Sequence, residues 1–413
     1  MLSIRPLLVI VLLIGALLCA GCTQPATEGS PTATPVPASS WAMSMHVPFA
    51  PIPVTSQGGE NIAYELELFP AGNGTLVPER VEVLDPATGT VLYSAEGAVL
   101  AALYHPATVP PPTAEELRNG TSKLAHPRIS LWFTVNRDAV PDRLVHRVTL
   151  SRTESGLPPL TVTGGEVAVR KDQEPVVIGP PFHGPGWVAM ETTSPFTHHF
   201  SAQITLDGVT RVPQRYAQDW IYVDPGTGDM VSGNASLARN YFGFGKEIYA
   251  VANGTVADAL DGLPDIETIY SAPPATFATA AGNYVILDMG NGKYACYARM
   301  VQGSVRVKKG DSVKEGDLLG LMGNSGNSDL PHLHFQVVEG TPMFLGAEGY
   351  PHEYRSFEVM GAINETCAID ASLRPGATMA DLWGGAREFA TFFDEATPRG
   401  NSLPENWDIV RFG

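Results

Sequence analysis

Two histidines separated by a single residue stand in the C-terminal third of the chain. They lie in the segment GNSGNSDLPHLHFQVV, residues 323–338. In a β-strand this spacing places His332 and His334 on one face, roughly 6–7 Å apart, with Leu333 and Phe335 on the other. Two neutral imidazoles on a rigid strand could supply a zinc ligand and a neighbouring acid–base group. A hairpin with two surface histidines is the alternative interpretation.

The composition predicts that β-strands position these residues. A chain of 413 residues is long enough for two domains plus tails. It has 42 glycines and 35 prolines, and charged residues make up 17%, which favours an all-β fold. The net charge of −17 and the isoelectric point near 5.0 argue against a nucleic-acid-binding protein.

The N-terminus indicates export. Arg5 precedes an apolar run over residues 7–20, which is shorter than a membrane-spanning helix requires and is typical of a signal peptide. Leu-Cys-Ala-Gly-Cys at residues 18–22 resembles a lipobox, so we expect a lipidated Cys22 and a place on the outer face of the cytoplasmic membrane or the cell surface. A non-lipidated signal or an uncleaved anchor is the alternative. Residues 23–45, which begin rich in Thr, Pro, Ala and Ser, are expected to form a tether.

Residues 46–172 alternate between apolar and polar positions in short runs separated by turn residues. This pattern predicts an immunoglobulin-like β-sandwich, with strands including 64–68, 81–85, 129–133 and 146–150. His105, His126 and His146 are isolated in this domain and are interpreted as surface or packing residues. The domain is expected to have a positioning or a binding role.

The second domain is expected over residues 173–360, after a segment rich in Pro and Gly. Its strands and turns continue through an Asn-Gly hairpin tip at Asn291 and end with the His-Leu-His strand. A C-terminal extension, 361–413, contains a predicted helix over 379–393 and a predicted edge strand over 408–412.

Residues 244–338 resemble the lysostaphin/LytM-type zinc metalloendopeptidases. The motifs that carry the resemblance are GKEIYAVANGTV, VKKGDSVKEGD and PHLHF, in this order. The resemblance implies a compact antiparallel sheet of the duplicated-hybrid-motif type with a groove, one Zn²⁺ per chain, and cleavage of peptide cross-links or stems in cell-wall polymers.

The resemblance also implies roles for individual positions. Asp219 matches the family's aspartate ligand and His334 the second histidine ligand. His332 matches one catalytic histidine. The first histidine ligand, four residues before the aspartate, is replaced by Arg215, whose guanidinium has no lone pair to offer a metal. The second catalytic histidine is replaced by Arg299.

A third ligand could come from His198-His199, about one hairpin upstream of Asp219. Neighbouring residues of a strand point to opposite faces, so one of the two is expected to bind the metal, and His199 is preferred. Arg299 could stabilise negative charge on the attacked carbonyl, but it cannot exchange a proton near neutral pH.

Three functions remain compatible with these residues. The first is an exported, membrane-tethered zinc endopeptidase that hydrolyses cell-wall or surface polymers, with weakened activity. The second is a catalytically degenerate module that binds an envelope polymer or a partner hydrolase. The third is a scaffold for envelope assembly. The sequence leaves open whether Cys296 and Cys367 pair.

Overall fold

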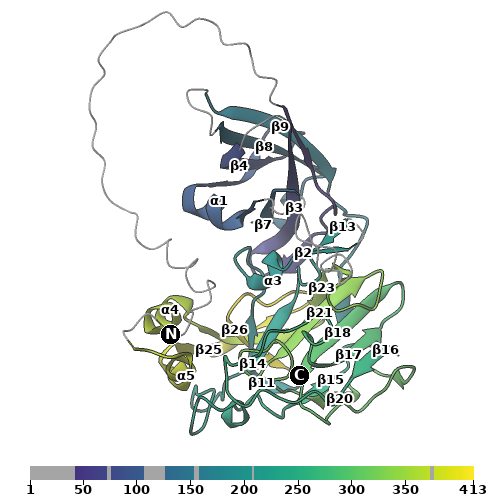
Figure 1. Ribbon diagram of the computed structural model, residues 1–413, viewed down its shortest axis with the longest axis vertical. Helices are drawn as coiled ribbons and strands as arrows, with labels where there is room; N and C mark the ends of the chain where they lie inside the picture. Colours follow the sequence, from purple (N-terminus) through teal and green to yellow (C-terminus); the bar gives the residue numbers. More distant parts are fainter. Residues whose placement is uncertain (1–41, 72–75, 107–125, 153–157, 207–208, 373–375) are drawn as a thin grey trace, which may run out of the picture.

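A computed structural model describes residues 42–71, 76–106, 126–152, 158–206, 209–372 and 376–413 (Figure 1). The predicted signal peptide, Cys22 and all but the end of the tether lie outside these ranges. Within them, no helix is both long and apolar enough to cross a membrane. The described chain is built mainly of strands, which confirms the all-β prediction.

The N-terminal part is a sandwich of two sheets. Ile62, Tyr64 and Leu66 point into the core between the sheets, whereas Glu65 points outward. This is the alternation that a strand imposes. The immunoglobulin-like topology stays a prediction. One sheet contains β1 (Ala42–His46), β2 (Val54–Ser56), β3 (Gly59–Ala71), β6 (Tyr104–His105) and β7 (Arg128–Val135), and the other β4 (Leu76–Leu84), β5 (Val91–Glu96), β8 (Arg143–Arg152) and β9 (Leu160–Ala168), with α1 (Gly97–Leu103) after β5.

The larger part of the molecule is organised by a second, antiparallel sheet. Its strands run in the order β19 (Ser312–Val313), β16 (Gly254–Leu260), β17 (Asn283–Asp288), β18 (Lys293–Met300), β21 (Leu333–Glu339), β14 (Gln218–Tyr222), β11 (Gly184–Met190), β26 (Asp408–Phe412), β24 (Phe357–Ile363) and β25 (Ala390–Arg399), and β22 (Glu348–Gly349) pairs with β21. Three two-stranded pairs lie around it: β10 (Val176–Ile178) with β23 (His352–Tyr354), β12 (Ile204–Leu206) with β13 (Val209–Arg211), and β15 (Glu247–Tyr249) with β20 (Leu318–Leu321).

The C-terminal extension differs from its prediction in two places. The final segment, 408–412, is no edge strand, because β26 lies inside the sheet between β11 and β24 and is almost wholly buried. The predicted helix over 379–393 is also too long. A capping box between Thr378 and Asp381 starts α5 (Met379–Gly384), and Gly385 forms its C-cap, because glycine favours helix ends. Of the remaining predicted residues, 386–388 form a short 3-10 helix and 390–393 belong to β25.

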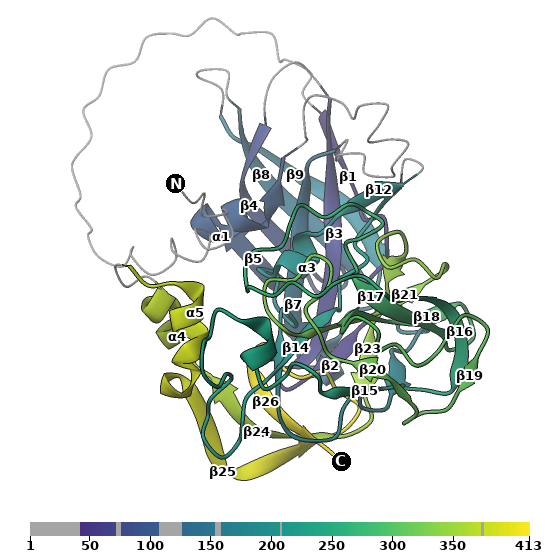
Figure 2. The ribbon, with the colours of Figure 1, turned by 60° about the horizontal axis from the view of Figure 1, so that its bottom comes forward.

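The two faces of the large sheet have different roles. Trp220, Leu333 and Phe335 belong to the main apolar core on one face. Asp219 and His334 alternate with these residues and so occupy the opposite face. On that face an apolar cluster contains Ile221, Ala368 of α4 (Glu365–Ser372) and Leu382 of α5, and the two helices lie at one end of the sheet (Figure 2). A smaller cluster contains Ile286 of β17, Cys296 of β18 and Val338 of β21.

The sandwich and the large sheet share buried contacts. Trp132, on the outer face of β7, packs edge-to-face on Phe200 with ring centroids 5.4 Å apart. Phe200 belongs to α3 (His198–Ser201), which lies where the two parts meet (Figure 1). The outward Glu65 forms an ion pair with Arg215, with an N–O distance of 2.6 Å. The sandwich is therefore packed directly against the element that carries the paired histidines.

Candidate metal centre

Asp219 and His334 are cross-strand neighbours. They stand opposite each other in the register of β14 and β21, and His334 Nδ1 lies 2.8 Å from Asp219 Oδ1. Directly opposed side chains of an antiparallel pair are naturally this close. The strand pairing alone therefore brings two of the predicted ligands together.

His199 joins them from α3. The sequence prediction put the His-His pair on a strand, but Thr197 caps a short helix here by accepting a hydrogen bond from the Phe200 amide. His199 is buried, with 1% of its side chain exposed, and its Nε2 lies 3.4 Å from Asp219 Oδ1. The structure thus places His199 where the preferred third ligand was expected, by a different local conformation.

His332 approaches the same carboxylate from the end of the loop before β21. Its Nε2 lies 3.5 Å from Asp219 Oδ1, and its Nδ1 lies 2.7 Å from the Leu330 carbonyl. His332 and His334 share a face of the sheet while Leu333 and Phe335 pack in the core beneath, as their spacing predicts.

The hydrogen bonds on the outer side of the three imidazoles assign their tautomers. His199 Nδ1 and His332 Nδ1 each face a backbone carbonyl, which can only accept, at 3.0 and 2.7 Å. His334 Nε2 faces the Gln336 carbonyl oxygen at 2.9 Å, and the Gln336 amide group donates to the Phe344 carbonyl. The nitrogen of each ring that faces a carbonyl oxygen, the outer nitrogen, must therefore carry the proton. In the neutral ring the other nitrogen, which faces Asp219 and is called the inner nitrogen here, then has an unprotonated lone pair.

This arrangement suits a cation. Three lone pairs converge on one carboxylate oxygen, and the inner nitrogens of His199 and His332 are buried without a partner. Buried polar atoms normally find a partner, and a metal among them would supply it. Zinc bonds of about 2.0–2.1 Å to nitrogen and oxygen put tetrahedral ligand atoms roughly 3.3 Å apart. The inner nitrogens of His199 and His332 lie 3.4 and 3.5 Å from Asp219 Oδ1, and that of His334 lies closer, at 2.8 Å.

The charges around Asp219 follow the same pattern. Burial alone would raise the pKa of Asp219, but His332, His199 and His334 outweigh it and hold that pKa well below its usual range. Burial lowers the pKa of His334 to about 3, although Asp219 opposes the shift. Burial also lowers the pKa of His332, against the pull of Asp219. Asp219 is therefore an anion, and burial favours the neutral form of His334 and of His332.

His198 is held outside this group. Its side chain is 40% exposed, and its Nδ1 pairs with the Glu191 carboxylate at 3.0 Å. Burial would lower the pKa of His198, but the hydrogen bond and the charge of Glu191 raise it. A nitrogen of His198 nevertheless lies within 4.8 Å of ligand atoms of both His199 and Asp219.

Arg215 points away from the metal centre. Its guanidinium donates two hydrogen bonds to Glu65, at 2.6 and 2.7 Å, and others to Glu348. The position that matches a histidine ligand in the resembled family therefore holds an ion pair between the sandwich and the large sheet. The Arg215 side chain therefore points away from Asp219, although Arg215 is only four positions before Asp219 in the sequence.

Arg299 lies near the centre at the end of β18. It has a φ of +74°, its amide donates to the Ala281 carbonyl, and its guanidinium donates to the Ala280 carbonyl. Burial lowers the pKa of Arg299 to about 10, while Asp219 and Asp329 raise it. Arg299 is therefore a buried cation at neutral pH, close enough to Asp219 for their charges to interact.

Sequence reasoning missed two residues that orient this centre. Gln336 shares the strand face of His334, two residues on, so the alternation of β21 could have revealed it. Glu191 sits seven residues before His198, and no spacing in the sequence indicates that it contacts both histidines.

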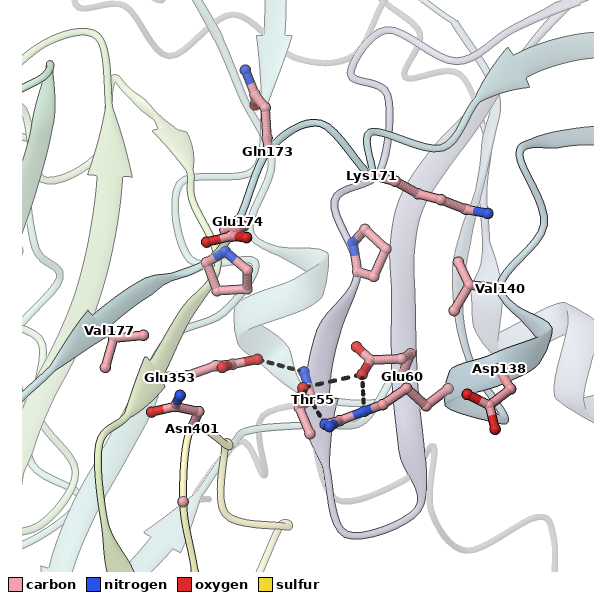
Figure 3. Close-up of a pocket in the computed structure, with 14 residues that line it drawn as sticks. Thr55, Glu60, Asp138, Val140, Lys171, Gln173, Glu174, Val177, Glu353 and Asn401 are labelled. Atoms are coloured by element: carbon pink, nitrogen blue, oxygen red, sulfur yellow. Dashed lines mark hydrogen bonds and ion pairs between the residues drawn. The ribbon is translucent and has the colours of Figure 1, made fainter.

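A cavity of about 690 Å³ opens at another junction between the sandwich and the large part (Figure 3). Glu353 accepts from the Thr55 amide, and Glu60 accepts from the Thr55 hydroxyl and from Arg137. These side chains pair with one another across the junction, and the cavity contains none of the residues around Asp219. Of the two cysteines in question, Cys296 is buried and Cys367 exposed, and they are not paired.

Part of this chain is similar to a known family. Residues 241–344 match the model of Peptidase family M23, which confirms the resemblance. The match contains Arg299, His332 and His334 and begins after Asp219. The matched region is therefore similar to M23 peptidases.

Two curated relatives are similar over short stretches. A 64-residue stretch, 15% of this chain, is 41% identical to the peptidoglycan DD-endopeptidase ShyA of Vibrio cholerae serotype O1 and covers 14% of it. A 95-residue stretch, 22% of this chain, is 33% identical to Endolysin 2638A of Staphylococcus phage 2638A and covers 16% of it. The matched stretches thus span about one-seventh of these relatives' lengths. Among solved structures, the catalytic domain of lysostaphin from Staphylococcus simulans shares 25% identity at a TM-score of 0.16, covering 27% of this chain and 78% of that one.

Proposed function

We propose that this protein is a zinc-dependent endopeptidase of the M23 type that cleaves peptide bonds of peptidoglycan or a related surface polymer. The observation that carries the proposal is the convergence of three imidazole lone pairs on Asp219. The substrate class is supported by the curated relative described as a peptidoglycan DD-endopeptidase.

Asp219, His334 and His199 would hold the metal. They supply the three protein ligands of a catalytic zinc site, and each histidine is oriented by a hydrogen bond on its other nitrogen. Zinc bound there supplies Lewis acidity and lowers the pKa of a bound water to about 7.

Two other residues would assist the reaction. His332 carries its proton on Nδ1 and presents a bare Nε2 toward Asp219, so it can accept a proton from the attacking water and return it to the leaving amine. Arg299 presents a fixed positive charge that can stabilise the oxyanion of the attacked carbonyl. With Arg299 in place of a second histidine, proton transfer rests on His332, and we expect slow turnover.

A binding module is the second candidate, favoured by the same buried Arg299. In this case the region around Asp219 would hold a wall polymer without cleaving it, and binding would persist in chelator and in a His332→Ala variant. Loss of polymer binding on metal removal would argue against this candidate.

Export and tethering are part of the proposal. The N-terminal signal and lipobox-like segment ending at Cys22 support a lipid-anchored protein outside the cytoplasmic membrane. A Cys22→Ala variant is then expected to leave the membrane fraction, and a variant that stays there would count against lipidation.

The test of the catalytic proposal is metal content followed by hydrolysis. We expect elemental analysis to find about one zinc per chain, lost in His334→Ala and in His199→Ala but kept in His46→Ala, whose side chain is 63% exposed. Purified peptidoglycan should release new amino groups with the wild type and none after chelation. A wild-type chain without stoichiometric metal would refute the proposal.

A further inference from the structure

Glu191 stands at the end of β11, immediately after the residue that pairs with Asp219. It has a φ of +58°, in the left-handed region that residues with side chains rarely adopt. A non-glycine residue held there is strained, and such strain gathers at functional sites. The backbone at Glu191 therefore needs an explanation from its surroundings.

Glu191 contacts both neighbouring histidines, each with a different group. Its backbone carbonyl accepts from His199 Nδ1 at 3.0 Å. Its carboxylate accepts from the backbone amide of His198 and pairs with His198 Nδ1, both at 3.0 Å. The carbonyl turns the bare nitrogen of His199 toward Asp219, and the carboxylate occupies His198.

His198 is close enough to compete for the same metal. One of its nitrogens lies within 4.8 Å of ligand atoms of His199 and Asp219, and its side chain is far more exposed than that of His199. A catalytic zinc keeps one coordination position open for water, whereas four protein ligands make a closed, structural site. Rotation of His198 onto the metal would close this one.

We propose that Glu191 is a positioning residue that assigns the two adjacent histidines to different roles: its carbonyl fixes His199 as a ligand, and its carboxylate keeps His198 off the fourth coordination position. This inference rests on the proposed function, because it requires a metal at the centre. It identifies the residue that keeps one coordination position of the metal open.

The experiment measures access to the open position directly. Wild type, Glu191→Ala, His198→Ala and the double variant are loaded with Co²⁺, and azide is titrated while the visible absorption of the cobalt is followed. Alanine at position 191 keeps the backbone carbonyl, so His199 retains its partner and the substitution isolates the carboxylate.

We expect azide to bind the wild type and His198→Ala with similar affinity, and Glu191→Ala at least roughly tenfold more weakly, because His198 then fills the fourth position. Removing His198 in the double variant should restore azide binding. If Glu191→Ala binds azide as the wild type does, or the double variant stays resistant, this inference is wrong while the proposed function stands. A wild-type chain that takes up no metal overturns both.

Discussion

Gln336 shows how much of the candidate metal centre depends on a single side chain that is not itself a ligand. Its oxygen accepts a hydrogen bond from the protonated Nε2 of His334, and its amide group donates a hydrogen bond to the Phe344 carbonyl. Together these hydrogen bonds keep His334 Nδ1 unprotonated, so that its lone pair faces Asp219. A residue with no hydrogen-bonding group at this position would leave the ring free to adopt the other tautomer.

We therefore expect Gln336→Leu to weaken zinc binding about 10–100-fold, the usual cost of losing a residue that orients a ligand. A competition titration against a chromogenic chelator measures this. Gln302→Leu, on an exposed loop glutamine that bonds the Gly262 carbonyl, is the matched control and should bind zinc as the wild type does. An equal affinity in both variants would contradict the role of Gln336.

His146 gives a second prediction at this scale, far from the metal centre. It is fully buried in the sandwich, between the Tyr64 hydroxyl and the Gly165 carbonyl. Burial lowers its pKa to about 4, against the backbone hydrogen bonds to it. Because the unfolded chain then binds more protons than the folded chain between about pH 6.5 and 4, stability falls as the pH drops through this window.

The contribution of His146 over this window is up to about 3 kcal/mol. Denaturant unfolding at pH 7 and pH 4.5 should show a smaller loss of stability in His146→Gln than in the wild type. His46→Gln, on an exposed histidine, should show the wild-type loss. The interpretation fails if His146→Gln is as sensitive to pH as the wild type.

At the scale of elements, the short helix α3 is the part that turns a strand pair into a possible metal centre. It is a single turn, too short to be stable by itself, and its Phe200 is buried against Trp132 of the sandwich. Trp132 also packs on Tyr216, with ring centroids 5.7 Å apart. The position of His199 therefore depends on a strand of the other domain.

Substitutions of two neighbouring residues of β7 can distinguish the role of Trp132 in positioning α3 from its contribution to the stability of the fold. Trp132→Ala and Phe133→Ala should each destabilise the fold by about 3–5 kcal/mol, since both remove a buried aromatic ring. Phe133 points into the sandwich core instead. Only Trp132→Ala should weaken zinc binding, by about tenfold or more, measured well below the unfolding temperature. Equal zinc affinities in the two variants would show that α3 keeps its place without Trp132.

At the scale of the whole molecule, Arg215 joins the sandwich to the large sheet, at a position where the resembled family has a metal ligand. It lies between Glu65 and Glu348, and all three side chains are buried. Burial raises the pKa of Glu348 to about 7 although Arg215 lowers it. The cation is thus needed to keep two carboxylates at this interface.

Removing the cation should be costly. We expect Arg215→Met to destabilise the protein by about 3–5 kcal/mol, because it leaves buried carboxylates unpaired. Arg411→Met, which breaks an exposed pair with Glu358, should cost about 0–1 kcal/mol. Thermal and denaturant unfolding would compare them, and similar costs would mean that the interface does not depend on Arg215.

The sequence by itself determined the all-β fold, the region similar to M23 peptidases, and the placement of the His332 and His334 side chains on one face of a strand. These follow from local causes: strand alternation fixes which side chains share a face, and an ordered set of motifs identifies the sheet that carries them. The same argument could have predicted Gln336, because its side chain also lies on that face.

Only the tertiary structure decided the rest. In our proposal Glu191 assigns His199 rather than His198 to the metal, through contacts over seven and eight residues that no regular spacing indicates. The outward direction of Arg215 depends on Glu65, which is 150 residues away in the sequence. β26 likewise lies inside the sheet because its partners β11 and β24 bury it on both sides. Contacts of this kind are fixed by burial and charge pairing between segments that meet only when the chain has folded, which no local spacing records.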